Sequence, residues 1–329
     1  MQRAQYTERG PIPQASIAAV EFTLPPLGPG QVLIKVLAAP INPSDVLTLT
    51  GVYGMLPPLP AVGGNEGVGV VAELGPGVTS PAIGQTVLLP VGAGTWSSHM
   101  VADAAKLMPL PNGVDPLQLA MMTVNPPTAH LLLKEFVDLQ PGDWVIQNAA
   151  NSGVGEYLIQ LAKIRGLKTV NIVRRDSAVA AVKAMGGDVV LVDGTGLAKS
   201  VAVATGSAKI RLGIDAVGGT STENIANCLT DGGVLVNYGM MSGESCAVSP
   251  SALVFRDITL RGFWLALWFR KATPIQQLAV FGELAKLIAS GKLTARVQAT
   301  YDISQIKDAV AAAAAGEREG KILIVPKKQ

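Results

Sequence analysis

Residues 147–155 read QNAANSGVG, and this stretch decides the fold of the 329-residue chain. An expected strand at 144–149 ends in these small residues. A helix follows, because Val154, Leu158, Leu161 and Ala162 recur on one helical face. A strand, a tight turn and a helix whose first N–H groups are free make a corner that binds phosphate. The sequence therefore predicts a dinucleotide-binding site at this turn.

The glycine fingerprint of such a site is only partly present. Its three positions fall on Ala150, Ser152 and Gly155, so only the third is a glycine. That third glycine lets the helix pack closely against the strand. The alternative is an ordinary small-residue turn without a ligand. The strand before the turn and the amphipathic helix after it favour the cofactor site.

Two arginines indicate which dinucleotide binds. Arg174 and Arg175 follow the next expected strand, 169–173, and begin nineteen residues after Gly155. An NAD-binding site needs a carboxylate there to hold the ribose 2′-hydroxyl, and that carboxylate would repel a 2′-phosphate. Guanidinium groups instead bind phosphate through charge-assisted hydrogen bonds. We therefore expect NADPH rather than NADH. The alternative is a solvated basic loop.

Strands alternate with helices through the middle of the chain, and this pattern predicts an α/β fold with a doubly wound parallel sheet. The first 120 residues differ, since short strand-like segments there are separated by Pro-Gly turns, which predicts a small β-domain. The last thirty residues predict a strand, an alanine-rich helix at 309–315 and a strand at 321–325. The other strands are expected at 32–37, 67–73 and 86–89 in the first region, and at 144–149, 169–173, 189–192, 212–217 and 234–238 in the second.

Composition excludes several classes of function. The chain has 26 basic and 24 acidic residues, a net charge of +2, which argues against nucleic acid and anionic membrane as partners. The two cysteines, Cys228 and Cys246, make no metal or disulfide framework, and His99 and His130 are far apart. No secretory signal or membrane-spanning apolar run is visible. We expect a cytoplasmic enzyme without a bound metal.

Several further motifs occur in order along the chain, including NPSD at 42–45, GGNEGVG at 63–69, VNPPTA at 124–129 and RGFWL at 261–265. With the 147–155 turn they resemble the medium-chain dehydrogenases/reductases, and more closely the mitochondrial-type 2-enoyl thioester reductases. The resemblance implies a GroES-like β-barrel domain from residues 1–120 and 298–329, and a Rossmann domain from 121–297. Where zinc enzymes of this superfamily have Cys and His ligands, this chain has Ser44 and Asn65, which implies a zinc-free member.

The resemblance also implies an activity, a cofactor and partners. These reductases use NADPH to reduce trans-2-enoyl thioesters of CoA or acyl carrier protein in fatty acid metabolism. The resemblance implies a homodimer formed by edge pairing of the Rossmann sheets, with the cofactor in the cleft between the domains. It assigns Tyr53 as the catalytic residue. The cofactor-lining residues that it implies are Asn125, Asn151, Ser152, Gly153, Val154, Arg174, Arg175, Tyr238, Gly239, Met240, Met241, Phe263, Trp264, Leu265 and Lys321.

Tyr53 suits this chemistry on physical grounds. Hydride addition to the β-carbon of an enoyl thioester leaves negative charge on the carbonyl oxygen. A neutral phenol can donate a hydrogen bond to that oxygen or pass a proton to the α-carbon. Gly51 and Gly54 would let the loop fold tightly around the ring. The alternative is a packed loop aromatic without a role in catalysis.

Two other functions stay open. One is an NADPH:quinone oxidoreductase on the same zinc-free fold, and the other is a protein that binds NADPH without turnover. Tyr53 argues against the second. Among the remaining polar residues, Asp45 and Glu66 could act as acid or base, but a structural hydrogen-bonding role is favoured.

Overall fold

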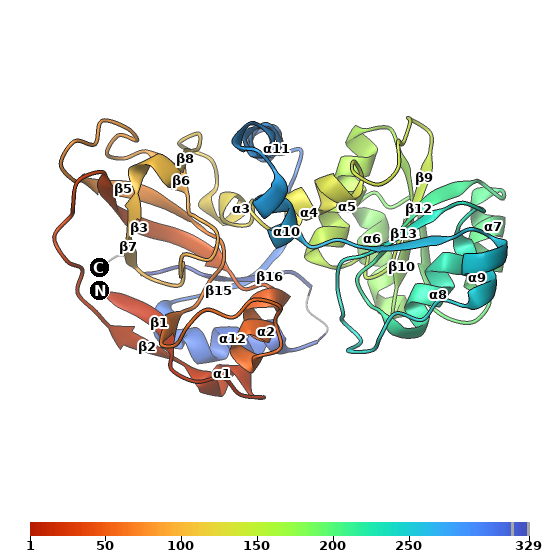
Figure 1. Ribbon diagram of the computed structural model, residues 1–329, viewed down its shortest axis with the longest axis horizontal. Coiled ribbons are helices and arrows are strands. Elements are labelled where there is room, and N and C mark those ends of the chain that lie inside the picture. Colours follow the sequence, from red (N-terminus) through yellow and green to blue (C-terminus); the bar gives the residue numbers. More distant parts are fainter. Residues whose placement is uncertain (317–318, 328–329) are drawn as a thin grey trace. The chain divides into compact units, whose positions relative to one another are not determined.

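The computed structural model describes residues 1–316 and 319–327 (Figure 1). The chain divides into two compact units. Unit 1 comprises Met1–Val124 and Phe281–Gln329, and unit 2 comprises Asn125–Val280. The domain ranges expected from the sequence, which change at 120 and 297, remain a prediction.

Unit 2 is built on one sheet of six parallel strands, which confirms the predicted doubly wound fold. The strands are β9 (Trp144–Gln147), β10 (Lys168–Val173), β11 (Val189–Val192), β12 (Ile210–Asp215), β13 (Val234–Asn237) and β14 (Thr259–Gly262). Their order is β11-β10-β9-β12-β13-β14, so the chain reverses its direction of winding between β9 and β12. In open sheets of this kind, ligands bind at that reversal, outside the carboxyl ends of the strands.

Helices cover both faces of this sheet (Figure 1). Right-handed crossovers place helices on opposite faces when the direction of winding reverses. One apolar cluster joins the sheet to α5 (Gly153–Ile164) and α6 (Val179–Ala184). A second joins the sheet to α7 (Leu197–Thr205), α8 (Gly219–Cys228) and α9 (Pro250–Phe255). The other helices that begin in unit 2 are α4 (Asn125–Leu132), α10 (Leu265–Lys271) and α11 (Pro274–Ala289).

Unit 1 is β-rich, as expected. A seven-stranded sheet runs in the order β15-β16-β3-β5-β6-β8, with β7 also paired to β3, and a smaller antiparallel sheet has the order β2-β1-β4. The strands are β1 (Gln2–Tyr6), β2 (Ile17–Glu21), β3 (Gln31–Pro40), β4 (Ala61–Val62), β5 (Val68–Leu74), β6 (Thr86–Leu88), β7 (His99–Asp103), β8 (Met108–Pro109), β15 (Val297–Tyr301) and β16 (Lys321–Ile324). The helices are α1 (Pro13–Ser16), α2 (Pro43–Thr50), α3 (Pro116–Ala120) and α12 (Ile306–Ala314).

The core of unit 1 is assembled from both ends of the chain. Tyr6 and Trp96 from the first hundred residues pack in one buried cluster with Ile306 and Ile322 from the last twenty-five. Strand β16 pairs antiparallel with the end of β3, with Leu323 opposite Pro40. Neither end can therefore complete this core alone.

Trp96 explains two of the glycines in the GGNEGVG motif. The indole is fully buried and its Nε1 donates a hydrogen bond to the Pro40 carbonyl at 3.1 Å. A Cβ at Gly63 would lie 2.2 Å from the Trp96 ring, and one at Gly64 would lie 2.6 Å from the same ring. Because side chains cannot approach that closely, the packing of Trp96 requires glycine at both positions.

Within the described part of the chain, no helix combines the length and the apolar character that crossing a bilayer demands.

Candidate functional site

The turn that decides the fold has the geometry of a helix N-terminus open to a ligand. Strand β9 ends at Gln147, and Ala149 adopts a left-handed conformation with φ of 46°. Ser152 is the N-cap of α5, and its hydroxyl accepts the Gly155 N–H at 3.2 Å. This cap leaves other first-turn N–H groups of a twelve-residue helix directed at the turn. The arrangement fits a pyrophosphate.

Gly155, the third fingerprint position, is required by the close approach of the helix to the turn. A Cβ at Gly155 would lie 2.5 Å from the Ala150 carbonyl oxygen and 2.8 Å from two further backbone atoms of that residue. The contact is backbone against backbone, so no side-chain rotation can relieve it. This is the packing role that the fingerprint assigns to its last glycine.

We therefore expect Gly155→Ala to lower the melting temperature and to weaken NADPH binding together, since the added methyl group pushes α5 away from the turn. Overpacking of this kind costs about 1–3 kcal/mol. Thermal unfolding and a fluorescence titration with NADPH measure the two effects. Gly282→Ala is a matched control, because a Cβ at that helical glycine of α11 meets nothing within 4 Å. Unchanged affinity in Gly155→Ala would contradict the assignment of this turn to the cofactor.

The two predicted arginines lie at the same edge of the sheet as this turn. Arg174 and Arg175 directly follow β10, the parallel neighbour of β9. The Ala150 N–H donates to the Ile172 carbonyl at 3.2 Å, which ties the turn to the end of β10. The Arg174 side chain is exposed and that of Arg175 is half-buried. This placement is compatible with a grip on a 2′-phosphate.

The residues after β13 reach the same turn. The Tyr238 and Ser152 hydroxyls are hydrogen-bond partners, so two of the predicted cofactor residues from distant parts of unit 2 meet. Burial is the main cause that raises the pKa of Tyr238, so its phenol stays neutral. A Cβ at Gly239 would lie 2.7 Å from the Ala216 carbonyl oxygen. Met240 and Met241 are 55% and 63% exposed, as expected of side chains on a ligand-binding edge.

The predicted Phe-Trp-Leu segment lies beside this strand end. The Phe263 N–H donates to the Asn237 carbonyl at 2.8 Å, and the Phe263 ring meets Phe136 edge-on with centroids 6.0 Å apart. The Arg270 guanidinium stacks over the Trp264 ring at 5.3 Å. Leu265 is the first residue of α10. Asn125 is buried at the start of α4. Val154, in the first turn of α5, is also buried.

Sequence reasoning missed a buried carboxylate at the centre of this edge. Asp215, the last residue of β12, is fully buried, and it accepts hydrogen bonds from Asn148 at 2.6 Å and from Asn237 at 2.9 Å. Asn148 directly follows β9, and Asn237 is the last residue of β13. The carboxylate therefore links the ends of three strands. A polar residue ends or follows each of these three strands, but only the sheet order shows that the three residues meet at one edge.

Tyr53 lies in unit 1, in the loop that follows α2. Gly51 ends that helix in the left-handed region with φ of 83°, which confirms its role in the turn. Gly54 lies in the bend formed by residues 53–55. Tyr53 is half-buried, and Val52 and Met55 beside it are 60% and 56% exposed. Its catalytic role stays a prediction.

Lys321 belongs to a buried polar cluster of unit 1. Its ammonium donates to Asn42 Oδ1, and Asn42 Nδ2 donates to Glu66 at 2.6 Å. Asp45 accepts the Asn42 N–H and the Asn65 Nδ2, each at 2.7 Å. Burial raises the pKa of Asp45 to about 7 and raises that of Glu66 as well. These hydrogen bonds give both carboxyls the structural role that the sequence analysis favoured.

The same cluster contains Asn65, one of the two residues that the sequence analysis placed where zinc enzymes of the superfamily have metal ligands. Asn42 and Asn65 lie within it, whereas Ser44 is a half-buried residue in the first turn of α2 outside these contacts. Among residues 1–316 and 319–327, no group of three or more His, Cys, Asp or Glu side chains could hold a metal ion.

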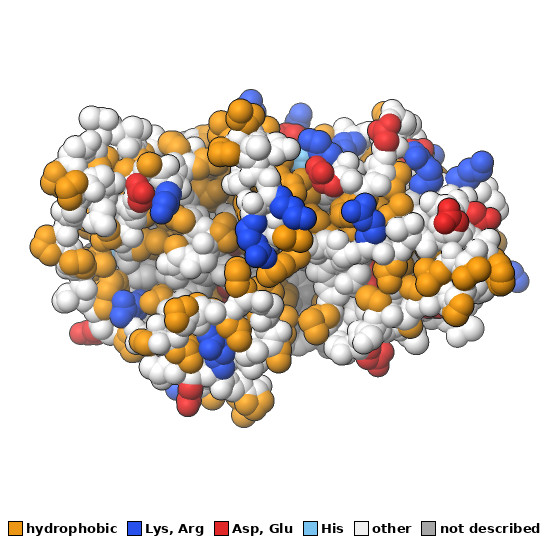
Figure 2. Space-filling model, viewed as in Figure 1, with side chains coloured by type: hydrophobic (Ala, Val, Ile, Leu, Met, Phe, Trp, Pro, Cys, Tyr) orange, Lys and Arg blue, Asp and Glu red, His pale blue; other side chains and the backbone are white. Residues whose placement is uncertain are grey.

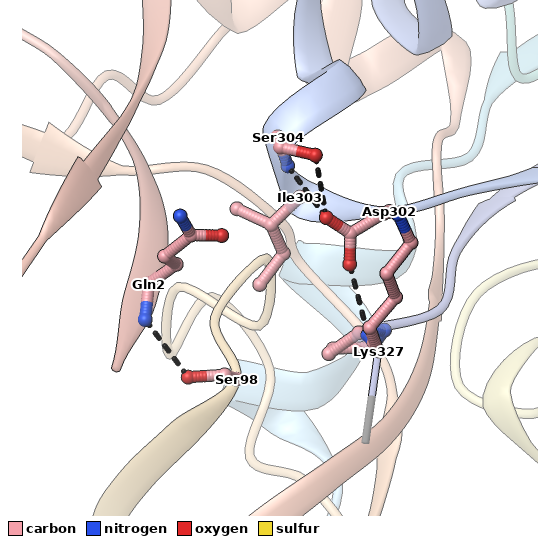
Figure 3. Close-up of a pocket in the computed structure, with 7 residues that line it drawn as sticks. Gln2, Ser98, Asp302, Ile303, Ser304 and Lys327 are labelled. Atoms are coloured by element: carbon pink, nitrogen blue, oxygen red, sulfur yellow. Dashed lines mark hydrogen bonds between the residues drawn. The ribbon is translucent and has the colours of Figure 1, made fainter. Parts of the chain in front are cut away.

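One pocket of unit 1 contains none of the predicted site residues. Figure 3 shows Asp302 accepting hydrogen bonds from Ser304 and from the Lys327 N–H, and Gln2 donating its N–H to Ser98. These polar groups satisfy one another, so the pocket indicates no chemistry of its own.

Two protein-family models match the chain. The model of the alcohol dehydrogenase GroES-like domain matches residues 28–112, and the zinc-binding dehydrogenase model matches residues 153–279. Together with the sheet order of unit 2, these matches define the class of the chain as a medium-chain dehydrogenase/reductase, an oxidoreductase with a GroES-like and a Rossmann part.

Relatives and solved structures narrow the class. Rat mitochondrial enoyl-[acyl-carrier-protein] reductase is 40% identical over 268 residues, which cover 80% of this chain and 72% of the rat protein. The Etr1p complex with NADP and crotonyl-CoA has a TM-score of 0.89 at 27% identity, covering 98% of this chain and 99% of that chain. Escherichia coli quinone oxidoreductase with NADPH has a TM-score of 0.87 at 26% identity, covering 99% and 100%. The chain belongs to the enoyl-[acyl-carrier-protein] reductase family of the medium-chain dehydrogenases/reductases.

Proposed function

We propose that this protein reduces the carbon–carbon double bond of trans-2-enoyl thioesters with NADPH, as a step of fatty acid metabolism. The observation that carries the proposal is the 40% identity to rat enoyl-[acyl-carrier-protein] reductase over 80% of the chain. The geometry of the nucleotide turn and the neighbouring arginines supports the choice of cofactor.

The residues of unit 2 fit NADPH. The N-terminus of α5 and the turn before it would hold the pyrophosphate, since the turn has no side chain larger than asparagine between Gln147 and Gly153. Arg174 and Arg175 would bind the 2′-phosphate. Tyr238 and the backbone of residues 239–241 would position the nicotinamide. When bound there, NADPH supplies the hydride.

Tyr53 supplies what the reduction needs beyond the hydride. We propose that its phenol donates a hydrogen bond to the carbonyl oxygen of the thioester, where negative charge develops, and delivers a proton to the α-carbon. The reaction then balances, because the β-carbon gains hydride and the α-carbon gains a proton that solvent replaces on the phenol.

One assay tests the function. NADPH oxidation is followed at 340 nm with crotonyl-CoA and, in parallel, with 1,4-benzoquinone. We expect turnover with crotonyl-CoA. A quinone reductase is the second candidate, because the E. coli quinone oxidoreductase shares the fold over the whole chain. Turnover with the quinone alone would replace the proposed function by the second candidate.

The carrier of the acyl group and the cellular compartment extend the proposal. The relatives are named enoyl-[acyl-carrier-protein] reductases, so we propose that this protein accepts enoyl thioesters of acyl carrier protein in addition to those of CoA. Measuring kcat/KM for crotonyl-CoA and for the crotonyl thioester of acyl carrier protein tests this proposal. The free thiols of Cys228 and Cys246 suit the reducing cytoplasm, and cell fractionation tests that placement.

We further propose a homodimer formed through the outer edge of the unit 2 sheet. In the described part of the chain β14 pairs with β13 alone, and all four of its residues are exposed. Figure 2 shows hydrophobic side chains gathered where α9 lies, and Val254 and Phe255 there are 70% and 82% exposed. An open strand edge beside an exposed apolar patch is a surface that a second copy would cover. One neighbour, from Candida tropicalis, is a heterodimer.

Phe255→Glu is therefore expected to convert the dimer into a monomer, because association would bury a carboxylate without a partner. Size-exclusion chromatography with light scattering measures the mass. Ile275→Glu is the matched control, since Ile275 is 81% exposed on α11 and should leave the dimer intact. A monomeric wild-type protein, or a dimeric Phe255→Glu variant, would refute this interface.

A further inference from the structure

The Asp215 carboxylate accepts five hydrogen bonds at the carboxyl edge of the unit 2 sheet. Its Oδ1 accepts from Asn148 Nδ2 at 2.6 Å, the Val217 N–H at 2.8 Å and the Gly218 N–H at 3.1 Å. Its Oδ2 accepts from the Thr222 hydroxyl at 2.7 Å and from Asn237 Nδ2 at 2.9 Å. All five donors are neutral groups, so the carboxylate acts as an anionic hub.

This hub reaches both turns that are proposed to hold NADPH. Asn148 opens the 148–155 turn, and its Oδ1 also accepts the Ala216 N–H at 2.8 Å. Asn237 opens the 237–241 turn, and its Nδ2 also donates to the Gly239 carbonyl at 2.9 Å. A backbone hydrogen bond also connects Asp215 to the 237–241 turn, since the Tyr238 N–H donates to the Asp215 carbonyl at 2.9 Å.

We propose that Asp215 is the positioning residue that sets the spacing between the 148–155 and 237–241 turns, and thereby the fit of NADPH across the sheet edge. The inference rests on the proposed function only in assigning those two turns to NADPH. Asp215 itself touches neither reacting atoms nor cofactor in this scheme, and it acts through Asn148 and Asn237.

The negative charge of Asp215 is what allows one side chain to hold both turns. A carboxylate accepts at both oxygens, whereas an amide of the same shape must present two N–H groups on one side. Burial raises the pKa of Asp215, but the hydrogen bonds from Asn148, Asn237, Val217 and Thr222 together hold it below the ordinary value. The hub is therefore ionised throughout the neutral pH range.

A double-mutant cycle with Asn237 tests the proposal by NADPH titration. In Asp215→Asn the new NH₂ group must take the place of one of the two carboxylate oxygens. It then faces either the Asn237 NH₂ group or the Asn148 NH₂ group, so in both orientations two donors oppose each other. In Asn237→Asp two carboxylates face each other across a 2.9 Å contact. Each single variant is expected to weaken NADPH binding about tenfold or more, the cost of one broken buried charge-assisted bond.

The double variant Asp215→Asn/Asn237→Asp restores a donor opposite an acceptor, because the amide introduced at position 215 can donate to the carboxylate introduced at position 237. We expect it to bind NADPH more tightly than either single variant. Recovery stays incomplete, since the new carboxylate cannot donate to the Gly239 carbonyl. A double variant that binds as weakly as the product of the two single effects predicts would overturn the proposal.

Asp188→Asn separates positioning from stability. Asp188 precedes β11 at the amino edge of the same sheet, where its Oδ2 accepts the Thr169 N–H at 2.8 Å. This control should lower the melting temperature and leave the NADPH Kd unchanged. Should Asp215→Asn not fold, Thr222→Val removes one donor at constant volume and should weaken binding by about two- to fivefold.

The wild-type titration distinguishes the two levels of inference. A wild-type protein that does not bind NADPH would overturn the proposed function. A wild-type protein that binds NADPH, with Asp215→Asn or Thr222→Val binding it equally well, would overturn the role of Asp215 alone.

Discussion

Tyr53→Phe is expected to lower kcat for crotonyl-CoA by about 10²–10³ while the NADPH Kd stays unchanged. The variant keeps the aromatic ring and removes only the hydroxyl. A hydrogen-bond donor aimed at a developing oxyanion contributes about 2.7–4 kcal/mol to the transition state, which corresponds to that loss of rate. The ground state gains little from the same bond, because the carbonyl oxygen carries its full charge only after hydride transfer.

Steady-state kinetics and a separate NADPH titration give the two quantities. Tyr301→Phe is the matched control, since Tyr301 is a half-buried tyrosine of the same unit, in β15, and no catalytic role is proposed for it. An unchanged kcat in Tyr53→Phe would remove Tyr53 from the mechanism. A large loss of NADPH affinity would instead indicate that the phenol shapes the cofactor site.

The second large effect is expected from the arginines after β10. Arg174→Ala/Arg175→Ala should weaken NADPH binding by about 10²–10³ and leave NADH binding nearly unchanged. Hydrogen bonds to charged groups contribute about 1.5–3 kcal/mol each. Two guanidinium groups on one 2′-phosphate therefore account for a loss of about 10²–10⁴, and the exposure of Arg174 to solvent places the expected value in the lower part of that range. NADH lacks the 2′-phosphate and loses nothing when the guanidinium groups are removed.

Competitive titrations of NADPH and NADH against the double variant and both single variants measure this discrimination. The single variants also show which arginine contributes more, because Arg174 is exposed and Arg175 is half-buried. Arg211→Ala is the control: its guanidinium pairs with Asp143 at 2.6 Å, away from the turn, and its removal should change neither affinity. Equal loss of NADPH and NADH binding would contradict the predicted 2′-phosphate site.

The predictable part of the fold is the part with strong local patterning. The doubly wound parallel sheet of unit 2 was predicted from apolar runs separated by helical periodicity, and all five expected strands of that region are present with ends shifted by at most two residues. Strand β14 was missed because all four of its residues are exposed, so it has no buried face to reveal it. Strands β1 and β2 were also missed, because their sequences QRAQY and IAAVE are rich in polar residues and alanine and show no strong strand pattern.

The site was predictable where a residue's role depends on its neighbours in sequence. Ser152 as an N-cap and Gly155 as a close-packing glycine could be inferred from the strand–turn–helix pattern. Asp215 could not, because its hydrogen bonds join Asn148, 67 residues away, and Asn237, 22 residues away. Only the parallel sheet brings these polar strand ends together, so a linear pattern shows three isolated polar residues. The buried cluster around Asn42 and Lys321 was missed for the same reason.

Because its core combines residues that lie before and after unit 2 in the sequence, unit 1 can complete its fold only after unit 2 has been synthesised. The strand β3 edge at Ala39 and Pro40 and the ring of Trp96 gain their packing partners only when α12 and β16 are synthesised, which is after all of unit 2. At 5–20 residues per second, the stretch after Val124 takes roughly 10–40 s to emerge. Unit 2 is contiguous and can fold first, while the nascent amino-terminal segment exposes unfinished apolar surface to chaperones for that whole interval.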